Sequence, residues 1–177
     1  MAKSAKELME ELARNKKFQN EKSLREKAQT ELENRIKADE QILIVDLSNV
    51  GININTVWDF VNSENNSYCY DALPVLVTHL RQQHHPKVIA GIARSLAVKE
   101  LSDDECLWNT LCQMYSEIQS DENIKEPSER GAQEAIAVAL EALSTKERVV
   151  DLKQLIEKTP NGDGSHWLRE RINYFNR

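Results

Sequence analysis

The sequence predicts an all-α fold in which a charged N-terminal helix precedes antiparallel pairs of helices. Only five of the 177 residues are glycine and 6% are aromatic, whereas β-rich folds usually need more glycine in turns and more aromatic residues in strands. Apolar residues in the second half recur at the i, i+3, i+4, i+7 spacing of an amphipathic helix. Prolines, glycines and polar loops divide that half into segments of helix length. We expect a helical segment over residues 1–40 and a helical-pair domain over 41–177.

Residues 1–40 have the pattern of a solvated helix. Ser4-Ala5-Lys6-Glu7 is a capping box, and ten Lys/Arg balance nine Asp/Glu in this stretch. The apolar residues between Leu24 and Ile36 recur every four positions, so they wind around the helix and keep no coiled-coil seam. We expect this helix to dock its second half on the following domain, with dimerisation as the alternative.

The run Ile42–Val45 fits either a buried strand or a helix. Leu43, Leu47 and Val50 continue a helical stripe, and the sequence has no second strand-like run to pair with it, so the pattern favours a helix ending at Gly51. A capped short helix is expected from Thr56 to about Asn62, followed by a polar loop over residues 63–67.

Three helix pairs are predicted after this loop. In the first, Pro86 opens the second helix, which suits a residue without an N–H. In the second, the capping box Ser102-Asp103-Asp104-Glu105 opens the first helix. The third pair spans residues 145–158 and 165–175, on either side of the helix breaker at 160–164. The apolar stripes of the first two pairs are Leu73, Leu76, Val77, Leu80; Ile89, Ile92, Ala93, Leu96; Leu107, Leu111, Met114, Ile118; and Ala132, Ile136, Ala139, Leu143.

The second helices of the first two pairs repeat. Residues 92–96 (Ile-Ala-Arg-Ser-Leu) align with residues 136–140 (Ile-Ala-Val-Ala-Leu) at an offset of 44. This period lies within the roughly 40–47 residues of HEAT and armadillo units.

Residues 70–80 (YDALPVLVTHL) and 86–97 (PKVIAGIARSLA) resemble HEAT-repeat proteins, in which an Ala-Leu-Pro opening, a turn and an Arg-containing Ala/Leu helix are typical. The likeness covers about residues 40–145, and the third helix pair departs from it, as a capping repeat does. Residues 57–62 and the charged helix before them look like a bacterial subgroup of small HEAT-like proteins. The resemblance implies a HEAT-like stack of about three repeats that binds a protein. By analogy with small bacterial immunity proteins, that protein is a basic toxin domain.

Composition and motifs argue against most other function classes. Residues 41–177 carry thirteen Lys/Arg against twenty Asp/Glu, which disfavours nucleic-acid binding. The sequence shows no recognisable signal peptide and no apolar run of about 20 residues, the length that spans a bilayer. Its three irregularly spaced cysteines fit reduced thiols, so we expect a cytoplasmic protein. We expect no metal and no cofactor, because His84-His85 lies in a turn that we interpret as solvated, and Cys106 and Cys112 fit inert buried thiols.

We therefore expect a binding protein and not an enzyme. The second helices of HEAT pairs usually line the concave face, and their exposed positions would be Lys87, Ala90, Arg94, Arg130, Gln133, Glu134 and Glu141. The acid-rich stretch 100–126 includes Asp103, Asp104, Asp121 and Glu122 and is a second candidate surface, with a solvated face as the plainer interpretation. Trp167 is a candidate anchor, with core packing as its alternative. The rival functions are a DNA-glycosylase-like enzyme, a lyase related to phycobiliprotein assembly, and self-assembly through the first helix.

Overall fold

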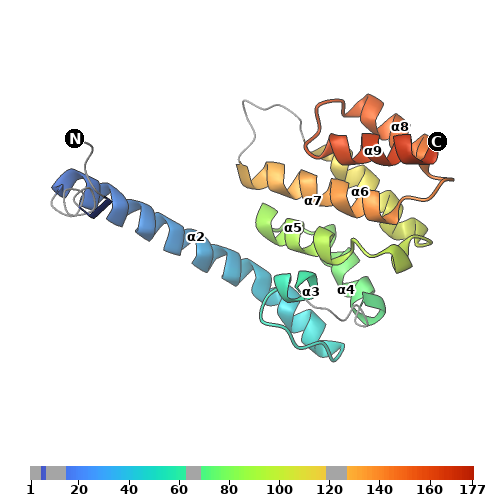
Figure 1. Cartoon of the computed structure of the whole chain (residues 1–177). Coiled ribbons are helices and arrows are strands. Elements are labelled where there is room, and N and C mark those ends of the chain that lie inside the picture. The colour runs from blue at the N-terminus through green and yellow to red at the C-terminus, as the bar shows by residue number, and fades with distance from the viewer. Residues whose placement is uncertain (1–4, 7–14, 63–68, 119–126) are drawn as a thin grey trace, which may run out of the picture. The chain divides into compact units, whose positions relative to one another are not determined.

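The computed structural model describes residues 5–6, 15–62, 69–118 and 127–177, and every regular element in these ranges is a helix (Figure 1). The prediction of an all-α chain is confirmed for these residues. The chain divides into two compact units, Met1–Ala38 and Asp39–Arg177. None of the described helices combines the length and the apolar character that a bilayer span requires. The expected capping box at Ser4 and the expected loop at 63–67 lie outside the described residues.

The first long helix, α2, runs from Lys16 to Asn49. The side chain of Asn15 accepts a hydrogen bond from the Phe18 N–H at 3.2 Å, which caps the helix start. The segment 42–45 is helical, so that prediction is confirmed. Gly51 follows the helix with φ of 85°, and the Ile52 N–H returns to the Leu47 carbonyl at 2.9 Å, as in a glycine C-cap.

In the second unit, the last turns of α2 pack through Leu43 and Leu47, which are fully buried. The short helix α3 (Trp58–Val61) lies where it was expected, but its N-cap residue is Val57, which makes no side-chain cap bond, and the polar contacts at its start come from Thr56 and Asp59. Its Trp58 N–H donates to the Thr56 hydroxyl at 3.0 Å, and the Asn55 N–H donates to the carboxylate of Asp59 at 2.8 Å.

The first helix pair consists of α4 (Cys69–Leu80) and α5 (Pro86–Ser95). Pro86 occupies the first turn of α5, as predicted. Helix α5 also packs on α3, and Gly91 permits this approach. A Cβ on Gly91 would lie 2.3 Å from Cγ1 of Val57, which is closer than two non-bonded carbon atoms can come.

The second pair consists of α6 (Glu105–Glu117) and α7 (Pro127–Leu143), and the third of α8 (Val149–Lys158) and α9 (Ser165–Phe175). The predicted cap at Ser102 is wrong. A 3-10 turn, η2 (Lys99–Leu101), comes first, and the Ser102 N–H bonds to the Lys99 carbonyl at 3.0 Å. Asp104 caps α6 instead, accepting from the Leu107 N–H at 2.7 Å.

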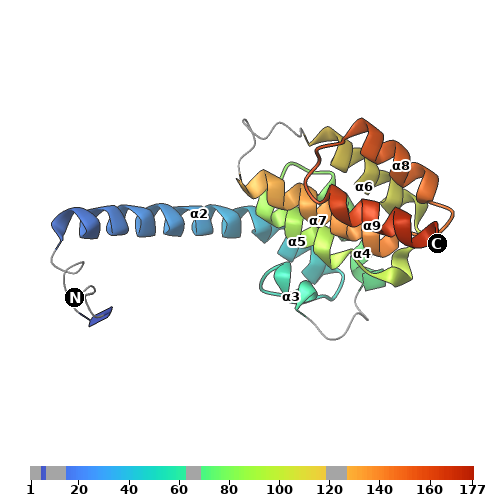
Figure 2. The same cartoon turned by 45° about the horizontal axis from the view of Figure 1, so that its top comes forward.

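Helix α7 is the centre of this unit. It packs against α5, α6 and α9, and α8 packs against α9 and α6 (Figure 2). Most of the circumference of α7 is buried, apart from a half-buried stripe that includes Glu134, Val138 and Glu141. Alanines at 132, 135, 137 and 139 allow neighbouring helices to approach closely. Trp108 and Tyr115 of α6 are buried in the core, so the prediction of a core position for Trp108 is confirmed.

Candidate functional site

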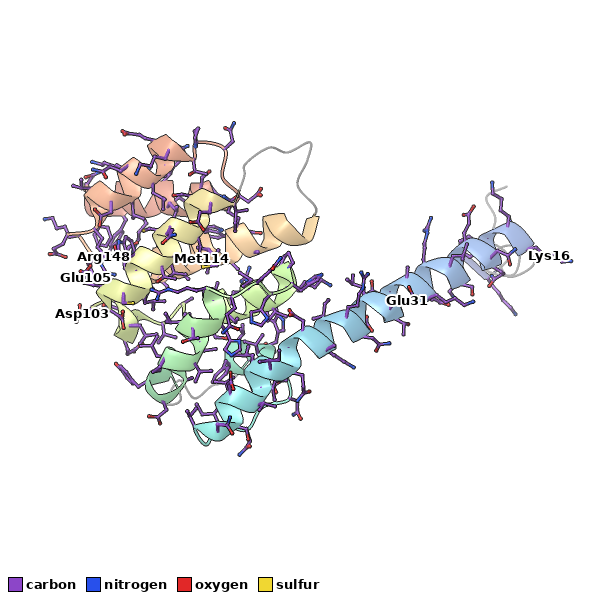
Figure 3. All side chains as sticks on the ribbon, turned by 180° about the vertical axis from the view of Figure 1, so that it is seen from behind. Lys16, Glu31, Asp103, Glu105, Met114 and Arg148 are labelled. Atoms are coloured by element: carbon purple, nitrogen blue, oxygen red, sulfur yellow. The ribbon has the colours of Figure 1, made fainter. Side chains whose placement is uncertain are left out.

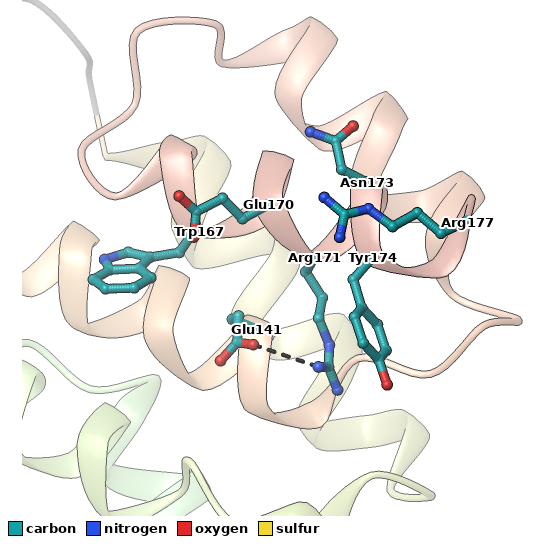
Figure 4. A pocket seen from close by; sticks show the side chains of 7 residues that line it. All are labelled: Glu141, Trp167, Glu170, Arg171, Asn173, Tyr174 and Arg177. Atoms are coloured by element: carbon teal, nitrogen blue, oxygen red, sulfur yellow. Dashed lines mark ion pairs between the residues drawn. The ribbon is translucent and has the colours of Figure 1, made fainter.

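One face of α9 forms a pocket with α7. The pocket has a volume of about 510 Å³, and Figure 4 shows its lining. The α9 residues that line it recur at helical spacing, which places them on a single face. The lining residues are Glu141, Trp167, Glu170, Arg171, Asn173, Tyr174 and Arg177. The structure thus brings together Glu141 and Trp167, which were predicted separately as partner-binding residues.

Arg171 ties this face to α7. Its Nη1 lies 3.7 Å from a carboxylate oxygen of Glu141, and its Nη2 donates to the Ser144 carbonyl at 3.4 Å. Its guanidinium carbon lies 5.2 Å from the ring centre of Tyr174 and 4.8 Å from that of Phe175. The buried Nε has no hydrogen-bond partner among the described residues. These contacts hold the guanidinium in one place beside the aromatic rings.

Two aromatic side chains of this face are open to solvent. Trp167 is 39% exposed and Tyr174 is 63% exposed. The ring of His166 lies 4.7 Å from that of Trp167, centre to centre. The core-packing alternative for Trp167 is therefore wrong, because the residue is exposed. Exposed Trp and Tyr beside Arg are the residue types enriched at binding hot spots.

The predicted surface of the second helices is only partly exposed. Lys87 is exposed, and Arg94 and Glu134 are half-buried. The predicted exposure of Ala90 and Gln133 is wrong, because their relative exposures are 7% and 0%.

Gln133 is buried because it bridges three elements. Its amide nitrogen donates to the carbonyls of Tyr115 at 2.9 Å and Ile118 at 3.0 Å, and its oxygen accepts from the Asp163 N–H at 2.9 Å. A buried amide of this kind satisfies backbone groups and cannot contact a partner. The side chain of Arg130, and the whole of Asp121 and Glu122, lie outside the part of the chain whose side chains are described.

The acidic residues near α6 have structural contacts. Asp103 is exposed, Asp104 is the helix cap, and Glu105 lies 3.5 Å from the guanidinium of Arg148 (Figure 3). Arg148 is buried and stacks 4.5 Å from the ring centre of Trp108. Glu117 lies at the far end of α6, roughly 18 Å from Glu105 at 1.5 Å per residue. An acidic docking surface at Asp103 stays a prediction.

The two cysteines of α6 differ in environment. Cys106 is exposed, and its sulfur accepts from Arg81 Nη2 at 3.2 Å, so the expectation that it is buried is wrong. Cys112 is half-buried beside Asp151. Burial, and secondarily the Asp151 carboxylate, raises the pKa of the Cys112 thiol to about 12. Cys112 therefore keeps its proton at neutral pH, which makes it a poor nucleophile.

The interpretation of His84-His85 as a solvated turn is wrong for His84, whose side chain is only 3% exposed. Its ring contacts the ring of His79 and the carboxylate of Asp39. Within the described ranges, no group of three or more His, Cys, Asp or Glu side chains is arranged to hold a metal ion. The pairing of His79 with His84 was not predicted from the sequence, although His79 lies in the helix before the predicted turn and His84 in the turn itself.

No family model matches the chain, and neither a curated protein nor a solved structure matches it.

Proposed function

We propose that the chain is a HEAT-like helical-repeat module that binds another protein through the α7–α9 surface, defined by the lining residues of the pocket in Figure 4. The order of the pairs α4/α5, α6/α7 and α8/α9 supports the HEAT-like part of the proposal. The second helix of each pair packs on the second helix of the next, α5 on α7 and α7 on α9, as neighbouring units of a helical-repeat stack do.

The observation that carries the binding role is the exposure of Trp167 and Tyr174 beside the fixed guanidinium of Arg171. Two large side chains on one helix face present apolar area, and the polar groups around them have both signs of charge. An apolar centre with a polar rim is the usual anatomy of a protein–protein interface. Burying the exposed parts of both rings would provide the driving force for association.

The toxin-neutralising role implied by the resemblance is a special case of this proposal, in which the partner is a basic toxin domain. Glu141 and Glu170 on the rim would be its acidic contacts. Arg171 and Arg177 offset their charge, so the surface favours a partner that presents an apolar side chain flanked by groups of both signs.

The test is quantitative affinity capture of the tagged full chain from its native cells, followed by mass spectrometry. The wild type is compared with Trp167→Ala/Tyr174→Ala and with a control, Val150→Ala, which removes a 60%-exposed apolar side chain from α8. A hot-spot residue costs about 2 kcal/mol or more on truncation, which is about 30-fold in affinity.

We expect one protein to be recovered in near-equal amount with the wild type and the control, and to be depleted at least tenfold with the double variant. Equal recovery with all three chains would remove this surface as the binding site. Circular dichroism of each variant checks that the helices are intact.

A further inference from the structure

Four side chains of the second unit form one hydrogen-bonded chain, Asp46–His79–His84–Asp39. His79 Nε2 lies 2.9 Å from Asp46 Oδ2, His79 Nδ1 lies 2.9 Å from His84 Nε2, and His84 Nδ1 lies 3.1 Å from Asp39 Oδ1. The side chains of His79 and His84 are 1% and 3% exposed. The two aspartates belong to α2, His79 to α4, and His84 to the turn that joins α4 to α5.

Three hydrogen bonds need three protons, but two neutral imidazoles bring only two. With two protons, one of the three contacts would set lone pairs against each other at 3.1 Å or less. With four protons on the rings, two N–H groups would point at each other across the 2.9 Å contact between them. The geometry therefore fits three protons shared by the two rings.

The third proton belongs to the rings and not to the carboxylates. Asp39 accepts twice, from the His84 ring and, through Oδ2, from the His85 N–H at 2.7 Å. Asp46 is 47% exposed at its side chain, so water stabilises its charge. Two ionised carboxylates at the ends of the chain stabilise one positive charge between the rings.

The other charged groups nearby are engaged elsewhere. Glu40 of α2 accepts from the Val57 N–H at 2.5 Å. The His85 ring accepts from the Lys87 N–H at 3.1 Å, and Arg81 at the end of α4 donates to Thr110 at 2.6 Å. None of these contacts involves the ring nitrogens that join His79 to His84.

We propose that His79 and His84 form a proton-binding site, which holds one shared proton between the two rings and thereby fastens the end of α2 to α4 and to the α4–α5 turn. This inference does not rest on the α7–α9 surface. When the site is occupied, all three hydrogen bonds form, and when the shared proton leaves, the central one is lost.

The proposal fixes how stability depends on pH. In the unfolded chain, two histidines carry four ring protons well below their ordinary pKa of about 6.5 and two well above it. The folded pair carries three. Above pH 6.5 the folded state binds more protons, so stability falls as pH rises. Below pH 6.5 the unfolded state binds more, so stability falls as pH falls. Stability contributed by this pair is therefore greatest near pH 6.5, with a limiting slope of tenfold in the folding equilibrium constant per pH unit.

The test is urea unfolding of the full chain from pH 5.5 to 8.5, for the wild type, the double variant His79→Gln/His84→Gln and the control His166→Gln, whose histidine lies exposed on α9. We expect the folding equilibrium constant of the wild type, divided by that of the double variant, to peak near pH 6.5 and to fall at least fivefold by pH 8. His166→Gln keeps the peak. A ratio that rises steadily toward pH 5.5 would mean two independent ion pairs, and a flat ratio would mean no titration. Both outcomes overturn the proposal.

A second measurement needs no variant. Nitrogen NMR of the wild type, labelled at histidine, counts the ring protons directly at pH 7. We expect three protons over the four ring nitrogens of His79 and His84, with His79 Nδ1 and His84 Nε2 sharing the third. A count of two protons would overturn the proposal even if the double variant His79→Gln/His84→Gln fails to fold.

Discussion

Gln133→Glu distinguishes the surface position expected from the sequence from the buried bridge in the structure. The side chain is fully buried and makes three hydrogen bonds to backbone groups of residues 115, 118 and 163. Glutamate has almost the same shape, but an ionised carboxylate cannot donate to the two carbonyls. The change therefore removes two hydrogen bonds and sets negative oxygens against carbonyl oxygens.

The loss follows from typical values. Each hydrogen bond contributes about 0.5–1.5 kcal/mol net, and a buried acceptor left without a donor costs about 1–3 kcal/mol. Two such acceptors give an expected decrease of about 2–6 kcal/mol in the free energy of unfolding. At a surface position the same substitution would change stability by less than about 0.5 kcal/mol.

Urea denaturation followed by circular dichroism measures this difference at pH 7. The matched control is Glu134→Gln, the adjacent residue of α7, which is half-buried and has the reverse change in charge. We expect the control to stay within about 0.5 kcal/mol of the wild type. A Gln133→Glu variant as stable as the control would refute the assignment of Gln133 to the interior.

Two further predictions concern packing and thiol chemistry. Gly91→Ala places a Cβ 2.3 Å from Val57 Cγ1 and should lower the free energy of unfolding, measured by denaturation, by about 1–3 kcal/mol. In the control, Gly131→Ala, the new Cβ meets no atom within 4 Å and should stabilise α7 by up to about 1 kcal/mol. Equal effects of the two substitutions would contradict the close approach of α5 to α3. Because its pKa is raised to about 12, the Cys112 thiol should resist alkylation at pH 8, whereas exposed Cys106 reacts. Peptide mapping by mass spectrometry measures the labelling at both cysteines. Equal labelling of the two in the folded protein would contradict the partly buried environment of Cys112.

The helices were predictable because each rests on local signals. The apolar stripes of Leu76, Leu80 and Ile92 face the core as their spacing requires, and Pro86 and Gly51 mark the helix ends expected of them. The cap at Ser102 failed because two carboxylates and a hydroxyl compete within four residues, and the 3-10 turn before α6 decides between them.

The site was only partly predictable because exposure depends on packing between distant elements. Helix α7 contacts α5, α6, α9 and the 3-10 turn η2, so positions that the sequence assigns to a polar face, such as Gln133, are buried. The pocket joins Glu141 to residues about 30 positions later in α9, and the histidine chain joins α2 to α4 across 33 positions. Single-sequence patterns carry no information on such pairings.

The central claim is that a protein binds at the α7–α9 surface, and site-specific photo-crosslinking in the native cells tests it most directly. A photoreactive phenylalanine derivative replaces Tyr174, which is 63% exposed, and in a parallel strain Val150, which is 60% exposed on α8. The proposal predicts a single discrete adduct from position 174 and none from position 150. Absence of an adduct at 174, or the same adducts from both positions, would contradict it.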